Sequence, residues 1–160
     1  MIHNTSIEPF FFLQKTMNME MTNIGLIPNS SYNDFVLGSN ISNYMDRGHT
    51  KKTYHESVFT NDSYHFIKED IDVWCELDGQ INTILCSSSC IYKGVELIGL
   101  EFSKFISLVE KVPDDNDVVY LSREGHRGQN QHVYDFDSLG LQIWVWRNRI
   151  RNVMICKFDE

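Results

Sequence analysis

Two stretches of the chain recur later in the sequence in the same order. Leu37–Tyr44 resembles Ile98–Phe105, which lies 61 positions later. Tyr64–Cys75 resembles Tyr134–Val145, 70 positions later, because each begins with Tyr-x-Phe and ends on an alternating strand that contains a tryptophan. Self-similarity in a fixed order indicates a structural unit that is used twice. The chain therefore has to fold so that both halves present the same elements.

Each half has the same order of elements: a helix-like segment led by a glycine, a loop, an aromatic pair, and an alternating strand that ends near a turn. This order predicts an α+β fold in which each half is a short helix followed by an antiparallel β-meander. Two such curved sheets can lie edge to edge or face each other as half-barrels. We expect residues 1–160 to form one compact domain made of two pseudo-repeats, about 25–92 and 93–160.

The strand over Ile71–Leu77 is the clearest single element, because apolar and polar side chains alternate along it. Asp78-Gly79 follows and supplies hairpin-turn chemistry, since both residue types tolerate a positive φ. Ile81–Cys86 is then the return strand.

The other elements have weaker signals. Helices are expected over 35–46 and 103–111, and the polar stretches 47–63 and 122–131 are expected to be mainly loop. Asn148-Arg149 is the expected counterpart of the Asp78-Gly79 turn. Further strands are expected over 10–13, 58–59, 64–67, 118–121, 133–136, 141–146 and 150–158.

The charge of the chain limits its partners. The net charge is −8 and the pI is about 5.2, so phosphates of nucleic acids and anionic membranes are repelled. The acidic excess lies mainly in the first 80 residues, which hold five basic and eleven acidic side chains, against nine and eleven in the last 80. This imbalance favours a protein partner with a basic face.

Nothing in the sequence resembles a targeting segment. The apolar run Phe10–Leu13 is too short to span a membrane and has no basic leader. We therefore expect a cytoplasmic protein whose four cysteines are reduced. Cys86 and Cys90 lie close together, but structural zinc needs a second such pair, so neither a metal nor another cofactor is expected.

A catalytic reading is available but weak. His126 and His132 flank a glycine-containing segment with Arg123 and Arg127, and a small hydrolase could use these residues as acid, base and phosphate ligands. The segment has no phosphate-binding glycine loop, and no nucleophile motif occurs elsewhere. We expect a solvent-facing or partner-binding loop here, and a protein that is not an enzyme.

Acidic residues around one tryptophan form the most informative candidate site. The expected strand carries Asp72, Trp74, Glu76 and Asp78 on one face, preceded by Glu69 and Asp70. A second acidic cluster follows Pro113, namely Asp114, Asp115 and Asp117. Aromatic anchors supply much of the energy of protein interfaces, and the surrounding charges steer association. Trp74 could alternatively pack beneath a helix or a second sheet.

The corresponding face of the second half carries Gln142, Trp144 and Trp146. Here a covering layer over the tryptophans is the favoured expectation. The nearby arginines are then free to pair with the acidic half across the internal seam; they are Arg147, Arg149 and Arg151.

Residues 35–158 resemble the small cytoplasmic immunity proteins of bacterial toxin systems, in particular those of contact-dependent growth inhibition. The resemblance lies in the strand–Asp78-Gly79–strand hairpin and in Tyr92-Lys93-Gly94 and Leu97-Ile98-Gly99 leading into an amphipathic helix. It implies a non-enzymatic inhibitor that binds the toxic domain of a cognate effector, often a nuclease, and blocks its active site.

The charge and the resemblance agree on one function. A nuclease site is basic because it attracts phosphate, and an acidic surface with aromatic anchors complements it. We expect an immunity protein that neutralises such a toxin and touches neither nucleic acid nor membrane directly. An adaptor module without a toxin partner and the small hydrolase remain as alternatives.

Overall fold

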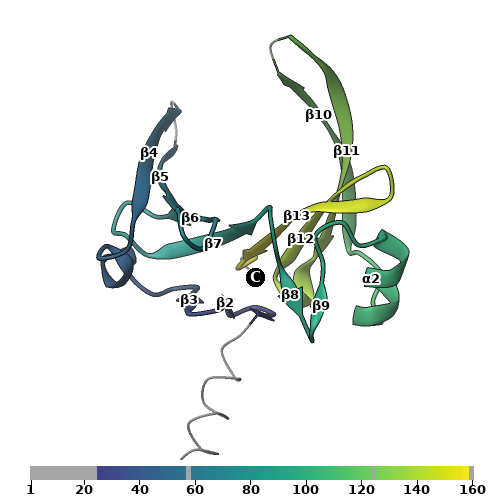
Figure 1. The fold of residues 1–160 in the computed structure, drawn as a ribbon, viewed down its shortest axis with the longest axis horizontal. Coiled ribbons are helices and arrows are strands. Elements are labelled where there is room, and N and C mark those ends of the chain that lie inside the picture. Colours follow the sequence, from purple (N-terminus) through teal and green to yellow (C-terminus); the bar gives the residue numbers. More distant parts are fainter. Residues whose placement is uncertain (1–24, 57–58, 124, 159–160) are drawn as a thin grey trace, which may run out of the picture.

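The dominant element of the fold is one antiparallel sheet of eight strands, in the order β10-β11-β12-β13-β7-β6-β5-β4 (Figure 1). The computed structural model describes residues 25–56, 59–123 and 125–158, so the strand expected over 10–13 lies outside the described residues. The strands are β4 (His49–Glu56), β5 (Phe59–Phe66), β6 (Ile71–Cys75), β7 (Ile81–Cys86), β10 (Asp115–Arg123), β11 (His126–Phe136), β12 (Leu141–Trp146) and β13 (Arg149–Cys156).

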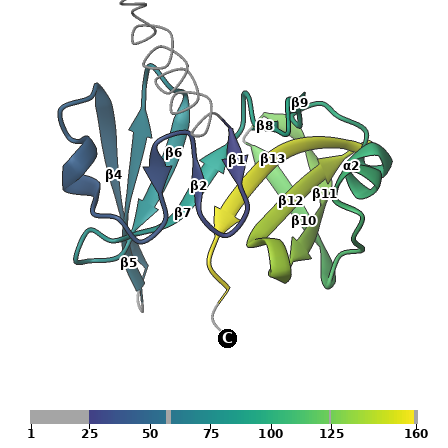
Figure 2. The ribbon, with the colours of Figure 1, turned by 90° about the horizontal axis from the view of Figure 1, so that it is seen from below.

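Small hairpins and short helices cover one face of this sheet (Figure 2). They come in two sets, each just before one group of four strands. The first set is β1 (Leu26–Ile27), β2 (Ser31–Tyr32), β3 (Phe35–Val36) and the 3-10 helix η1 (Ile41–Tyr44). The second is β8 (Ile91–Tyr92), β9 (Val95–Glu96) and the α-helix α2 (Phe102–Val109), and a second 3-10 turn, η2 (Asp137–Leu139), joins β11 to β12.

The core lies between the sheet and this covering layer. Alternate residues of β6 and β12 are buried, as period-two strands require when one face meets a core. Aromatic side chains hold the short helices against the sheet: Tyr44 of η1 packs on Phe66 of β5, and Phe105 of α2 packs edge-on against Phe136 of β11. The architecture is mostly β, with curved antiparallel strands and one α-helix, which agrees with the predicted α+β class.

The sheet consists of two four-stranded meanders, β4–β7 and β10–β13, joined by the antiparallel pairing of β7 with β13. Leu85 and Met154 are opposite each other at the centre of this joint. On either side of them, Cys86 pairs with Val153 and Ile84 with Ile155.

The start of each short helix is tied to the tip of a hairpin by similar backbone hydrogen bonds. The amide of Ile41 donates to the carbonyl of Gly79 at 2.8 Å, and the amide of Phe102 donates to Asn148 at 2.9 Å. Just before these, the amides of Gly38 and Gly99 each donate at 2.8 Å to the first buried isoleucine after the turn, Ile81 and Ile150.

The sequence located the central strands but misjudged the outer ones. Strands β6, β7, β12 and β13 and the Asp78-Gly79 turn are confirmed, with the expected second turn displaced by one residue to Arg147-Asn148. The polar stretches 47–63 and 122–131 are largely strand, contrary to the prediction, because they form the long hairpins β4–β5 and β10–β11. Strands at a sheet edge need no continuous apolar face, so apolar and polar residues do not alternate clearly in their sequences.

The expected helix over 35–46 is also wrong in part. Phe35 and Val36 belong to the small hairpin β2–β3, and only Ile41–Tyr44 is helical, as a single 3-10 turn. Asn40 caps this turn by accepting a hydrogen bond from the amide of Ser42 at 3.0 Å. The second helix, α2, lies at Phe102–Val109, close to its predicted position.

Candidate partner-binding face

The face of the eight-stranded sheet opposite the core is not covered by any element of the described residues. We call it the uncovered face. In Figure 1 it is the side toward which the hairpins β4–β5 and β10–β11 rise, away from β2–β3, β8–β9 and α2. Paired residues carry one row of side chains across all eight strands of this face. The members of this central row are Thr50, His65, Asp72, Leu85, Met154, Gln142, Asp135 and Asp115.

All three tryptophans of the chain lie on the uncovered face, and each is half-buried. Trp74 is two residues after Asp72 on β6, and Trp144 is two residues after Gln142 on β12. Because β6 and β12 run in opposite directions, Trp74 and Trp144 lie on opposite sides of the central row. Trp146 lies at the end of β12. The covering layer expected over Trp144 and Trp146 is thus not found among the described residues.

Trp74 lines a shallow depression of about 360 Å³. His65 Nδ1 is 3.0 Å from Asp72 Oδ1 within it, and His65 Nε2 is 3.6 Å from Asp70 Oδ1. The depression beside the indole is thus lined by one carboxylate, that of Asp72, and by a cationic side chain, Lys52. The full lining is Thr50, Lys52, Ser63, His65, Asp72, Trp74 and Leu85.

The tryptophans of the second half are held by polar contacts. Trp144 Nε1 donates to Gln142 Oε1 at 2.9 Å, and Gln142 Nε2 donates in turn to Asp135 Oδ1 at 2.8 Å. The guanidinium carbons of Arg147 and Arg151 lie 4.3 and 4.9 Å from the centre of the Trp146 ring, in cation–π contact. These contacts restrict the orientations of the two rings.

The uncovered face also buries residues of its own. Val133 is buried, but it is not part of the main core, because it pairs with Trp144 on the opposite face of the sheet. Gln131, two residues earlier on β11, is buried with its Oε1 atom lacking a hydrogen-bond partner in the described structure. The curvature of the sheet brings these side chains under their neighbours.

The acidic strand face predicted from the sequence is shorter than expected. Asp72 and Trp74 do share the uncovered face, but β6 ends at Cys75, so Glu76 and Asp78 do not continue it. Glu76 accepts a hydrogen bond from Asn82 Nδ2 at 2.8 Å, and Asp78 Oδ1 accepts from the amide of Gln80 at 3.0 Å. Both carboxylates therefore stabilise the hairpin turn.

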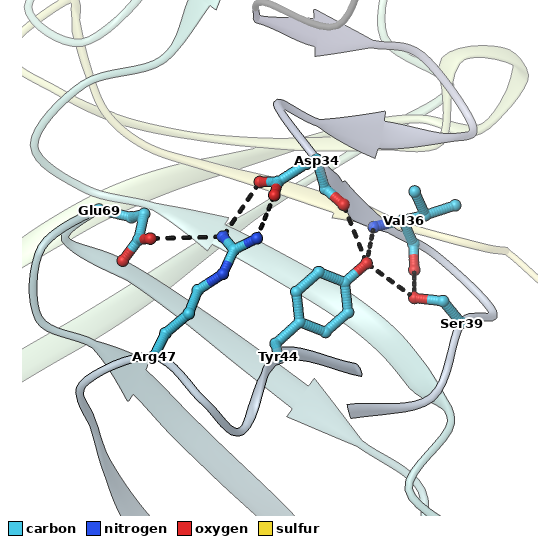
Figure 3. Close-up of polar contacts among 6 residues, drawn as sticks. All are labelled: Asp34, Val36, Ser39, Tyr44, Arg47 and Glu69. Carbon is cyan, nitrogen blue, oxygen red and sulfur yellow. Dashed lines mark hydrogen bonds and ion pairs between the residues drawn. The ribbon is translucent and has the colours of Figure 1, made fainter. Parts of the chain in front are cut away.

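Glu69 and Asp70 lie in the turn before β6 and make separate contacts. Asp70 adopts a positive φ of 53° and accepts a hydrogen bond from the Ser88 hydroxyl. Glu69 Oε1 lies 3.3 Å from a guanidinium nitrogen of Arg47 (Figure 3). Arg47 also bonds to Asp34 in a bidentate arrangement, so Glu69 belongs to the anchoring of the covering layer.

The second predicted cluster divides in a similar way. Asp115 and Asp117 lie on the uncovered face of β10, opposite Asp135 and Val133 of β11. Asp114 instead accepts a hydrogen bond from the amide of Asp137 at 2.8 Å and closes a loop. Desolvation, with added repulsion from nearby carboxylates, raises the pKa of Asp137, which shows how crowded with negative charge this end of the sheet is.

The arginines of the second half stay within that half. Arg149 lies 3.6 Å from Glu101, the residue before α2, and Arg147 and Arg151 flank Trp146. The predicted pairing of these arginines with the acidic first half is therefore not found among the described residues.

Catalytic arrangements find little geometric support. His126 and His132 lie on the same strand, β11, six positions apart, which is about 20 Å of extended chain. Desolvation raises the pKa of the Cys75 thiol to about 12 and that of Cys156 to about 11, so neither is a thiolate at neutral pH. Within the described ranges, no three His, Cys, Asp or Glu side chains are placed to hold a metal ion.

No helix in the described part of the chain has the length and apolarity to cross a bilayer. No family model, curated protein or solved structure matches the chain. Function therefore has to be inferred from the geometry of the uncovered face.

Sequence reasoning missed several members of this face. His65 and Asp135 occupy the same place in the two Tyr-x-Phe segments, one residue after the tyrosine, and strand parity alone puts them opposite Asp72 and Gln142. That signal was present in the sequence. What the sequence could not show is which face of the sheet the small hairpins would cover.

Proposed function

We propose that this protein is a binding module of the immunity type, which docks a basic toxic domain, such as a nuclease, on its uncovered face. One observation carries the proposal: a whole face of an eight-stranded sheet without a covering layer in the described structure, with all three tryptophans half-buried on it. Large uncovered surfaces of this kind mark interaction sites, and tryptophan is the residue most enriched at their energetic centres.

The carboxylates of the uncovered face suit a basic partner, although Lys52 lies beside Trp74, and Arg147 and Arg151 lie beside Trp146. Asp72, Asp115 and Asp135 lie in the central row, and Asp117 lies beside it on β10. Carboxylates placed around aromatic anchors attract a cationic surface over long range and repel nucleic acid. A nuclease held here would be kept from its substrate. Such an inhibitor acts in the cytoplasm and needs no catalytic group of its own.

We further propose that the two meanders are copies of one unit. The hydrogen bonds at the helix starts support this, and so does an identical register of β5–β6 and β11–β12 when 70 is added to each residue number. Each meander also has a bulge at the same place, after Trp74 and after Trp144. The antiparallel joint then relates the halves by a two-fold axis near Leu85 and Met154.

The duplication gives the binding face two equivalent anchors. Trp74 and Trp144 are related by the proposed axis, so a partner wide enough to cross the central row contacts both. Of the residues predicted from the sequence, Asp72, Trp74, Asp115 and Asp117 are the ones we assign to the partner. Asp70, Glu76, Asp78 and Asp114 support turns and loops instead, and Glu69 anchors the covering layer through Arg47.

The alternatives differ in what they require. An adaptor with a different basic partner would use the same face and is distinguished only by the partner. The hydrolase alternative would need His126 and His132 to converge on one substrate, which their spacing along β11 does not favour.

The test is co-expression with the toxic domain encoded immediately upstream of this chain's gene. Wild-type protein should rescue growth and co-purify with that domain. Trp74→Ala should weaken binding about 100-fold, and Asp72→Asn should mainly slow association at low salt. Leu77→Ala and Asp46→Asn are the matched controls, because both residues are exposed outside the central row. Unchanged affinity for Trp74→Ala and Trp144→Ala, or absence of rescue by the wild type, would contradict the proposal.

A further inference from the structure

Strand β10 is an outer edge of the sheet and pairs only with β11 among the described strands. Its other side therefore presents a row of backbone donors and acceptors. Monomeric proteins usually protect such an edge with lysine, proline or a bulge, because it can pair with another chain. The opposite edge, β4, has this protection in the neighbouring Lys51 and Lys52. β10 contains neither lysine nor proline, and the register shift in its pairing with β11 lies near its end, between Leu121 and Arg123.

The middle of β10 is apolar and exposed. Val118, Tyr120 and Leu121 have exposed fractions of 51%, 65% and 40%. The Tyr120 ring lies across β11 where Gly128 leaves room: a Cβ atom on Gly128 would stand 2.0 Å from the ring. The tyrosine is thus held in place beside the edge. Val118 and Tyr120 are not part of the main core and lie on the other face of β10 from Asp115 and Asp117, whereas Leu121 shares the uncovered face.

We propose that β10 pairs antiparallel with β10 of a second copy of this chain. A two-fold axis that joins two edges into one sheet is perpendicular to the sheet, so it keeps each side chain on its own face. Residues that are directly opposite each other in a sheet point to the same face, whereas neighbours along one strand point to opposite faces. The two-fold axis must therefore pass beside one residue, which is then opposite the same residue of the other copy. β10 runs from Asp115 to Arg123 and is centred on Val119.

Centring on Val119 makes the two strands complementary. Val118 of each copy is then opposite Tyr120 of the other copy, and the apolar segments of both chains lie together. It also sets the acidic position 115 opposite position 123, an arginine in the sequence. Opposite charges on facing residues stabilise a strand pair, and like charges destabilise it. Self-pairing of β4 about its middle would instead bring Lys52 against Lys52.

The geometry of the proposed contact already occurs inside the molecule. β7 and β13 meet antiparallel, with Leu85 and Met154 opposite each other at the centre. The β10 contact would extend the sheet sideways and leave the uncovered face of each copy free. Asp115 takes part in both proposals, but Val118 and Tyr120 lie on the other face of β10, so variants of these two residues test dimerisation without changing the uncovered face. Failure of dimerisation therefore does not imply failure of partner binding.

Sedimentation equilibrium of the full chain tests the proposal. The wild type should form dimers, and Val118→Lys with Tyr120→Lys should raise the dissociation constant at least about tenfold with unchanged circular dichroism. Thr53→Lys on β4 and Val112→Lys, an exposed position outside the edge, are the matched controls and should leave it unchanged. Monomers at every concentration up to about 0.2 mM would overturn the proposal, and so would weakening by Thr53→Lys alone.

Charge exchange tests the register. Asp115→Arg and Arg123→Asp should each weaken the dimer, because each places like charges opposite one another, and the double variant should recover the wild-type dissociation constant. Additive losses in the double variant would rule out the pairing centred on Val119.

Discussion

Tyr64–Phe66 and Tyr134–Phe136 pair with the following strands in the same register. Their side chains correspond on the core face of the sheet and differ on the uncovered face. The residues that face the core keep their character: Phe66 corresponds to Phe136, and Tyr64 to Tyr134. The residue between them does not, since His65 corresponds to Asp135. Its cross-strand partner changes as well, from Asp72 to Gln142. The first meander thus has a His–Asp contact where the second has an Asp–Gln hydrogen bond.

The tryptophans are the exception on the uncovered face. Trp74 and Trp144 occupy the same register position in the two meanders, although neither fills the core. Core-facing positions resemble each other because both halves must fill an interior at high density. That reason does not apply to a half-exposed indole, whose presence in both halves is what the proposed contact with a partner requires.

The covering layers differ more than the strands do. The first half has one 3-10 turn, four residues long, and gathers Phe35 and Tyr44 around Phe66, with Arg47 over the rings of Phe35 and Tyr44. The second has an eight-residue α-helix and gathers Phe102 and Phe105 around Phe136. The two meanders thus pack against covering layers that differ in their helices and aromatic residues.

The largest expected effect tests whether both packings contribute equally. Phe66→Ala and Phe136→Ala each remove a ring that is at most 1% exposed, so each should lower the free energy of unfolding by about 3–5 kcal/mol. Urea titration at neutral pH measures both. Leu77→Ala, at a side chain 75% exposed, should change it by less than about 0.5 kcal/mol. A loss below about 1 kcal/mol for either phenylalanine would show that one covering layer is dispensable.

The core positions were predictable because they repeat at period two and lie between strong turn signals. Ile71, Val73 and Cys75 alternate in the sequence and are all buried. The outer hairpins were not predictable from the same pattern. Much of these hairpins lies beyond the core, since residues 50–53 and 127–130 are exposed or half-buried, and the strands are specified by pairing with their neighbours.

The candidate site was predicted in part for a similar reason. Asp72 and Trp74 share a face because strand parity requires it, and this could be known without a structure. That Glu76 and Asp78 turn away depends on β6 ending at Cys75, and that Glu69 is bound to Arg47 depends on a contact between distant segments. Neither fact has a local sequence signal.

A smaller effect is expected at the two hairpin tips that receive the helix starts. Gly79 has a φ of +86°, and a Cβ atom there would lie 3.0 Å from Asn40 Oδ1. Gly79→Ala should therefore cost about 1–2 kcal/mol of stability, measured by urea unfolding. The corresponding residue, Asn148, already holds a φ of +60° with a side chain, so Asn148→Gly should stay within about 0.5 kcal/mol. Equal losses of stability for Gly79→Ala and Asn148→Gly would contradict the view that only the first tip requires glycine.

The smallest effect concerns Arg47, whose contacts with Asp34, Phe35 and Tyr44 have no counterpart in the second half (Figure 3). The hydrogen bonds and charge of Arg47 lower the pKa of the Asp34 carboxyl. Asp34 is 53% exposed, so solvent screens this pair, and Arg47→Met should cost only about 1 kcal/mol at pH 7, cation–π contacts included.

The pH dependence of that loss has a definite sign. A carboxyl whose pKa is lowered by folding stabilises the protein above its unfolded value, about 3.9, and this stabilisation disappears as pH falls through the lower folded value. The stability difference between wild type and Arg47→Met should therefore be constant near neutral pH and shrink below about pH 4. Arg149→Met, which removes an exposed pair with Glu101 and a hydrogen bond to the carbonyl of Gly99, is the control from the second half and should cost no more than about 1 kcal/mol. A difference for Arg47→Met that grows on acidification would mean that the ion pair with Asp34 is not what holds the first covering layer to the sheet.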